Sequence, residues 1–195
     1  MAQPQPAPLV KYIIAVLYSS ESALQNVLPL LEQQWGSIDY QSKPYPFDQT
    51  DYYQQEMGDN LQRELIAFDK LLSPEELVVA KLWCNELEAS LSVSPLPSAG
   101  EGVGVRGLQP KRTINLDIGY LDHNKIVLAS VKGLGQKIYL SQGIYADLVA
   151  RYGHGRYQPF EWTFPDFKTG RYDADLAQLR QIYLNQMKAR RSQSE

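Results

Sequence analysis

The clearest hydrophobic pattern is the run Val10–Tyr18, in which β-branched and aromatic residues follow one another with almost no polar position. Such a run is typical of a strand that is buried on both faces of a sheet. Apolar residues then recur at intervals of three and four over 24–35, between Ser20 and Gly36. This spacing predicts an amphipathic helix with a serine cap at its start and a glycine at its end.

A second helix is predicted after residue 72. Ser73-Pro74-Glu75-Glu76 combines a capping serine, a proline at the first helical position and a glutamate at the capping-box position. The apolar stripe of this helix consists of Leu77, Ala80, Cys84, Leu87 and Leu91. Between the two helices, 37–47 has an extended pattern, whereas 61–72 fits a strand or a short helix.

Short β-rich runs dominate the second half of the chain. The runs 113–121, 125–131 and 137–140 predict an antiparallel meander, with a hairpin turn at Asp122-His123-Asn124. The next segment, 143–152, fits a strand or a short helix, and 157–167 is aromatic and irregular. A final helix places Tyr172, Leu176, Leu179, Tyr183 and Met187 on one face.

These elements predict an α+β fold, with a mostly antiparallel sheet and packed helices. The early order of strands and helices resembles an elaborated ferredoxin-like sandwich. We expect a single domain over 10–190 after a disordered, proline-rich leader, 1–9. Residues 92–110 are rich in Ser, Pro and Gly and are predicted to form a flexible insertion.

Composition narrows the class of protein. A hydrophobic fraction of 44% with 21% charged residues is ordinary for a globular domain. The net charge of −3 makes bulk nucleic-acid binding unfavourable, because such binding relies on a cationic surplus. One cysteine cannot form an internal disulfide or a cysteine-rich zinc site. Without a signal peptide or an apolar run of membrane-spanning length, the sequence predicts a cytoplasmic protein with no membrane partner.

Several familiar motifs fail on their context. Residues 102–107 spell G-x-G-x-x-G, but prolines on both sides exclude the strand and helix that a dinucleotide site needs. Residues 133–137 lack the spacing of a phosphate loop. Cys84 lies on a buried helical stripe, which predicts a small core residue, not a nucleophile. His123 and His154 lack a partner histidine at metal-binding spacing.

Polar residues interrupt the apolar run at 113–121. The period of two in a strand places Asn115 and Asp117 together on one face. Both are poor strand formers, so this face is either solvated, with surface ion pairs, or part of a polar site. The further candidate ligand-binding residues are Glu56, Arg112, Lys132, Lys137 and Tyr145.

The chemistry of these candidates indicates two kinds of ligand. Asp117 and Glu56 are candidate metal ligands, because carboxylate oxygens suit Mg²⁺ better than zinc. The nearby lysines and arginine suit a phosphorylated ligand.

Six ordered segments resemble the signature segments of a bacterial family called domain of unknown function 4416. They are Phe47–Gly58, Arg112–Leu121, Lys125–Ser130, Lys137–Leu140, Gly143–Asp147 and Trp162–Phe167. The resemblance extends roughly from Lys11 to Tyr183 and implies no established activity. The family's usual Asp-Pro-Gly is Asp117-Ile118-Gly119 here, and its usual His-Arg is Gln136-Lys137. A catalytic role of that histidine would therefore be lost in this chain, and 92–110 looks like an insertion relative to the family.

Two hypotheses about function follow. In the first, the protein binds a small anionic or nucleotide-like ligand together with a divalent ion such as Mg²⁺, with or without hydrolysing it. In the second, it is a non-catalytic interaction module that contacts a protein partner through 157–167 and the last helix. Both leave enzymatic activity and oligomeric state open.

Overall fold

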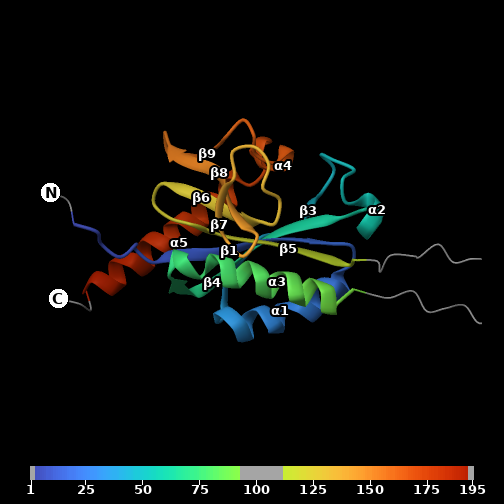
Figure 1. Ribbon diagram of the computed structural model, residues 1–195, viewed down its shortest axis with the longest axis horizontal. Helices are drawn as coiled ribbons and strands as arrows, with labels where there is room; N and C mark the ends of the chain where they lie inside the picture. Colours follow the sequence, from blue (N-terminus) through green and yellow to red (C-terminus); the bar gives the residue numbers. More distant parts are fainter. Residues whose placement is uncertain (1–2, 93–111, 193–195) are drawn as a thin grey trace, which may run out of the picture.

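The computed structural model describes residues 3–92 and 112–192, and Figure 1 shows one sheet with helices packed on it. The strands are β1 (Val10–Tyr18), β2 (Ile38–Gln41), β3 (Tyr45–Pro46), β4 (Gln62–Leu72), β5 (Ile114–Leu121), β6 (Lys125–Ser130), β7 (Ile138–Ser141), β8 (Ile144–Gly153) and β9 (Arg156–Pro159). The helices are α1 (Glu21–Trp35), α2 (Gln54–Met57), a short 3-10 turn (Pro74–Glu76), α3 (Leu77–Ser90), α4 (Pro165–Lys168) and α5 (Asp173–Ser192).

The strands pair in the order β2-β4-β1-β5-β6-β8-β7, with β3 on β4 and β9 on β8. All of these pairs are antiparallel. The predicted α+β class with a mostly antiparallel sheet is therefore confirmed. The ferredoxin-like resemblance remains a prediction. The order β2-β4-β1-β5 is compatible with it, and β6 to β9 extend the sheet beyond that unit.

In the first half of the chain, the apolar run and the capping residues form the elements that they predict. All nine positions of β1 are buried, and β1 pairs with β4 on one side and β5 on the other. The Ser20 side chain accepts a hydrogen bond from Ala23 N–H at the start of α1, and Gly36 ends that helix with φ of 98°. Ser73 caps the turn before α3 in the same way, through Glu75 N–H. The ambiguous segment 61–72 is a strand because it pairs with β1 along its length.

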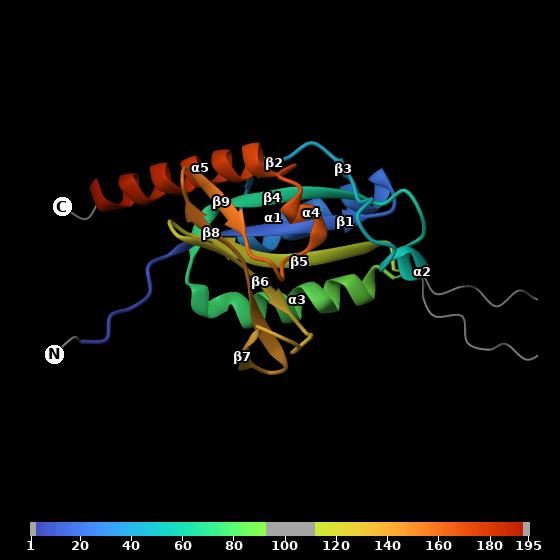
Figure 2. The same cartoon turned by 90° about the horizontal axis from the view of Figure 1, so that it is seen from above.

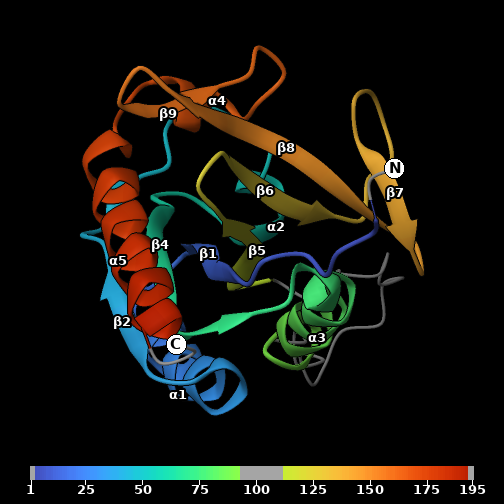
Figure 3. The ribbon, with the colours of Figure 1, turned by 90° about the vertical axis from the view of Figure 1, so that its left-hand side faces the viewer.

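Helices cover both faces of the sheet. Helices α1 and α3 pack on one face, where Leu24, Trp35 and Cys84 belong to the same buried cluster as Ile14 of β1. Helix α5 packs on the opposite face, and its Leu179 and Tyr183 join the buried cluster that contains Ile13. Figures 2 and 3 show α3 and α5 on opposite sides of the strands. Successive side chains of β1 therefore pack into two different hydrophobic cores, because neighbouring side chains in a strand point to opposite faces of the sheet.

The predicted meander is wrong in its last step. Strands β5 and β6 form the expected hairpin around Asp122-His123-Asn124, but β8 lies between β6 and β7. The longer β8 provides partners for β6 on one edge and for β7 on the other, which places β7 at the edge of the sheet. The segment 143–152, which fits either a strand or a helix, is therefore a strand.

Strands β5 and β6 separate soon after their hairpin. They pair only over Gly119–Leu121 and Ile126–Leu128, so within 3–92 and 112–192 no strand pairs with the first part of β5 on that side. Gly119 stands where the pairing ends. A Cβ atom at Gly119 would lie 2.0 Å from the carbonyl oxygen of Val127 and 2.8 Å from the Cα of Leu128. The close approach therefore needs a glycine, and beyond it the two strands leave a gap that becomes the candidate site.

Parts of the predicted domain organisation lie outside the described residues. This applies to Met1 and Ala2 of the leader and to 93–110 of the predicted insertion. Within 3–92 and 112–192, no helix has the length and apolar character needed to cross a membrane.

Candidate functional site

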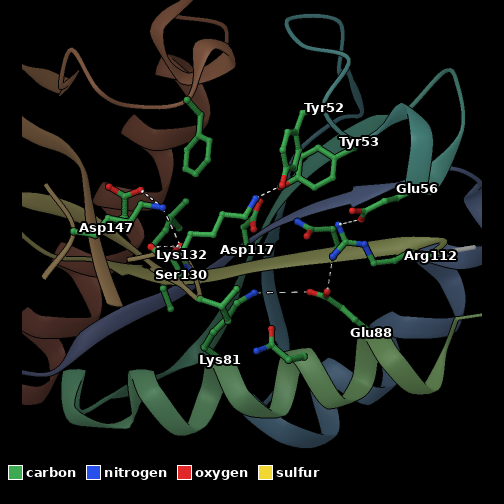
Figure 4. A pocket seen from close by; sticks show the side chains of 17 residues that line it. Tyr52, Tyr53, Glu56, Lys81, Glu88, Arg112, Asp117, Ser130, Lys132 and Asp147 are labelled. Atoms are coloured by element: carbon green, nitrogen blue, oxygen red, sulfur yellow. Dashed lines mark hydrogen bonds and ion pairs between the residues drawn. The ribbon is translucent and has the colours of Figure 1, made fainter. Parts of the chain in front are cut away.

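The gap between β5 and β6 contains a cavity of about 210 Å³. Figure 4 shows α3 on one side of it and Tyr52, Tyr53 and Glu56 on the other. The remaining lining comes from the start of β5, the end of β6, the loop that follows it, Asp147 of β8 and Phe164. Segments far apart in the sequence therefore supply one site, and charged residues make up nearly half of its lining.

Helix α3 replaces the missing strand partner of β5. Lys81 Nζ donates a hydrogen bond to the carbonyl oxygen of Leu116 at 3.0 Å, and Leu116 N–H donates to Glu88 Oε1 at 2.7 Å. Lys81 and Glu88 are two helical turns apart, so both side chains extend toward the same strand. Their charged groups, 3.9 Å apart, satisfy backbone groups that would otherwise be buried without a partner.

Arg112 closes one end of the cavity by bridging two carboxylates. Its Nη1 lies 3.1 Å from Glu88 Oε2, and its Nη2 lies 3.0 Å from Glu56 Oε2. The guanidinium also lies 5.5 Å from the centre of the Tyr53 ring. Burial raises the pKa of Glu88, and the positive charges of Lys81 and Arg112 oppose that rise. Burial and the charge of Asp117 raise the pKa of Tyr53, so its hydroxyl is neutral at physiological pH.

The Asp117 carboxylate forms an ion pair with a buried arginine. Arg63 Nη2 lies 3.2 Å from Asp117 Oδ2, and Arg63 Nη1 lies 3.0 Å from Asp166 Oδ2. Tyr172 donates a second hydrogen bond to Asp166 Oδ2 at 2.9 Å. Burial opposes the charge of Arg63, but the two carboxylates outweigh this effect and raise its pKa. The network fixes the Asp117 carboxylate at the cavity wall.

The opposite end of the cavity is formed by the β6–β7 loop. Lys137 Nζ donates to Ser130 Oγ at 2.9 Å and lies 3.3 Å from Asp147 Oδ2. Gln136 Nε2 donates to the other oxygen of Asp147 at 3.0 Å. Lys132 reaches across the cavity mouth and donates to the hydroxyl of Tyr52. Its Nζ also lies 4.1 Å from the centre of the Tyr52 ring.

Two residues that line the cavity carry a buried donor without a partner among the described residues, Arg112 at Nε and Asn115 at Nδ2. Asn115 is 5% exposed, and its amide nitrogen donates no hydrogen bond within 3–92 and 112–192. A buried amide without a partner costs about 1–3 kcal/mol, so its presence at a cavity wall indicates that something else accepts its hydrogen bonds.

Most of the residues predicted from the sequence meet at this cavity. Its lining includes Glu56, Arg112, Asn115, Asp117, Lys132 and Lys137. Tyr145 is not part of the lining. The Tyr145 ring packs directly against Gly133 of the β6–β7 loop, because a Cβ atom at Gly133 would lie 2.3 Å from the ring. The centres of the Tyr145 and Tyr139 rings are 5.2 Å apart.

The sequence reasoning missed Lys81, Glu88 and Asp147, together with the aromatic residues Tyr53 and Phe164. A signal for two of them was present. Lys81 and Glu88 lie on the same face of α3 as the buried residues Leu77 and Cys84. A charged residue on an apolar helix face indicates that it has a buried polar partner. Asp147 offered a weaker signal, since its neighbours on the same face of β8, Tyr145 and Val149, are both apolar.

The two predicted metal ligands each face an arginine. Asp117 is paired with Arg63 and Glu56 with Arg112. Among residues 3–92 and 112–192, no group of three or more His, Cys, Asp or Glu side chains is arranged to hold a metal ion. Cys84 is buried in the core, as predicted, and burial raises the pKa of its thiol.

Comparison with known proteins gives one match. No curated protein and no solved structure shows significant similarity to the chain. A family model described as Domain of unknown function (DUF4416) matches residues 8–183, which include every element from β1 into α5 and all residues of the cavity. The chain therefore belongs to the DUF4416 family.

Proposed function

We propose that the protein binds a small anionic ligand in the cavity between β5 and β6. The observation that carries this proposal is the set of donors around one cavity. Lys81 lies in α3, Arg112 lies just before β5, and Lys132 and Lys137 lie in the β6–β7 loop. The buried Asn115 amide adds N–H groups that have no acceptor among the described residues. Convergent donors at a concave site with a few apolar walls are typical of anion recognition.

The cavity volume limits the size of the ligand. About 210 Å³ corresponds to about seven water molecules, and drug-sized ligands usually occupy 300–1,000 Å³. A complete dinucleotide does not fit this space. Phe164, Tyr53 and Leu128 supply an apolar wall against which the organic part of a small ligand can pack.

Binding of a divalent ion and hydrolysis of the ligand remain predictions from the sequence. In both, Asp117 would act, as a metal ligand or as a general base. Their test is a comparison of ligand binding and turnover with and without Mg²⁺ in wild type and Asp117→Asn. Equal turnover in both proteins would contradict that role of Asp117.

The binding proposal is tested by calorimetric titration and thermal-shift measurements with sugar phosphates, mononucleotides and small carboxylates. Asn115→Leu is the most informative variant. It removes the amide without removing any protein hydrogen bond of Nδ2, so the fold should persist while binding weakens. Lys188→Gln, on the exposed end of α5, is the matched control and should bind like wild type. Failure of every anion to bind wild type would refute the proposal.

A second candidate function, protein–protein interaction, is favoured by a different surface from the predicted one. Tyr157 and Phe167 are buried, and the apolar face of α5 packs on the sheet. Within 157–167 the side chain of Trp162 is exposed, but among the described residues most exposed large apolar side chains lie in the β6–β7 loop and on β7. They are Val131, Leu134, Ile138, Tyr139 and Leu140.

An uncharged edge strand of this kind can pair with the same strand of a second copy of the chain. Sedimentation at increasing protein concentration tests this, with Tyr139→Lys as the variant. A wild type that stays monomeric at all concentrations would exclude self-association through β7.

A further inference from the structure

We infer that the anionic group of the ligand is a phosphate, bound at the end of the cavity formed by Lys132, Lys137 and Ser130, and that the ligand is the phosphate monoester of a small hydroxylated molecule. This inference rests on the proposed function and specifies which anion the cavity takes and in which orientation.

Positive charge is unevenly available among the basic residues of the cavity. Arg112 is neutralised by Glu56 and Glu88, and Lys81 lies beside Glu88. Lys137 lies beside Asp147. Lys132 differs from these three, because in the part of the chain that the structure describes its Nζ contacts only Tyr52 and no carboxylate. The charge available to an incoming anion is therefore located at Lys132.

The number of free N–H donors at the Lys132 end also favours a phosphate. An ammonium group has three N–H donors. Tyr52 occupies one donor of Lys132, whereas Ser130 and Asp147 occupy two of Lys137. Three N–H groups thus remain at this end, and a phosphate monoester presents three terminal oxygens. A carboxylate presents only two, so a phosphate satisfies the donors of this end more completely.

The opposite end of the cavity carries two carboxylates. Glu56 and Glu88 lie beside Arg112, on the other side of Asp117 from Lys132 (Figure 4). These carboxylates disfavour a second anionic group. Asp117 and the unpartnered Asn115 amide between the two ends suit hydroxyl groups, because one accepts and the other donates hydrogen bonds. The geometry thus favours a phosphate at one end and hydroxyl groups toward the middle.

The test uses three probes and is read by calorimetric titration and by ³¹P NMR line shifts. Glycerol phosphate carries both predicted parts, inorganic phosphate only the anion, and glycerate the hydroxyl groups with a carboxylate. Wild type should bind glycerol phosphate tightest and glycerate weakest. Lys132→Gln should weaken both phosphate-containing probes about tenfold or more, and Lys188→Gln should leave them unchanged. Lys132 is exposed, so circular dichroism should report the same fold in this variant.

The outcomes separate this inference from the proposed function. If glycerate binds as tightly as glycerol phosphate, the phosphate assignment is wrong and anion binding at the cavity stands. If Lys132→Gln binds phosphate like wild type while Asn115→Leu does not, the anion lies elsewhere in the cavity. If no probe and no other anion binds wild type, both the inference and the proposed function fail.

Discussion

Lys81 and Glu88, two turns apart on α3, bind the same residue of β5, the lysine at the Leu116 carbonyl oxygen and the glutamate at its N–H group. An ordinary sheet would satisfy both groups with a neighbouring strand. Here the helix does so with side chains, and this allows β6 to separate from β5 without leaving buried backbone groups unsatisfied. The pair therefore supports the wall of the cavity as well as lining it.

Removal of the Glu88 carboxylate should destabilise the fold. Glu88→Ala leaves the Leu116 N–H and the Lys81 ammonium buried without this acceptor, which should lower the free energy of unfolding by about 3 kcal/mol. Urea denaturation measures the change. Glu86→Ala on the exposed face of the same helix is the control and should change stability by less than about 0.5 kcal/mol. Similar losses in both variants would contradict the role of Glu88.

Titration of Glu88 should contribute to the pH dependence of the protein's stability. Its pKa is raised in the folded protein, so the folded state binds the proton more tightly than the unfolded state. The contribution of Glu88 to stability is therefore greatest below the unfolded carboxyl pKa of about 4.3 and falls as pH rises toward its folded pKa.

Glu88→Gln removes this group, so unfolding titrations across pH 4 to 7 should show a less negative slope of stability against pH in the variant. A slope that is identical in both proteins would refute the raised pKa.

Substitution of Gly119 should be costly although alanine is a small residue. The added methyl group would lie 2.0 Å from the Val127 carbonyl oxygen, so β5 and β6 would have to move apart. We expect Gly119→Ala to destabilise the protein by about 2 kcal/mol or more. Gly153→Ala in β8 is the matched control, because the nearest atom to its Cβ is a side-chain oxygen 3.6 Å away. Thermal unfolding of both variants measures the difference.

The buried ion pairs of Arg63 should matter far more than exposed ones. Arg63→Met leaves Asp166 buried and Asp117 largely buried without their common cation, and should cost about 4 kcal/mol. Arg156→Ala breaks an exposed pair with Asp173 and should cost no more than about 1 kcal/mol. If Arg63→Met, measured by urea denaturation, were as stable as Arg156→Ala, the network behind Asp117 would contribute nothing to folding.

Local patterns predicted several elements correctly. The almost continuous apolar run of β1 predicted a strand buried on both faces, and the caps Ser20 and Ser73 marked the starts of helical segments. The alternation along 113–121 also separated Asn115 and Asp117 from the apolar face. Such features depend on residues that are close in sequence, because side-chain direction repeats every two residues in a strand and about every 3.6 in a helix.

The site itself depended on contacts between distant residues. The sequence alone could indicate that Asn115 and Asp117 share a face, but it could not indicate that β6 separates from β5 beside them or that β8 lies between β6 and β7. It could not pair Lys81 with Leu116, which is 35 residues away. The family match is visible in the sequence, whereas the cavity exists only after folding. Strand order and buried ion pairs are decided by the packing of the whole chain, in which each buried polar group must find a partner wherever the fold supplies one.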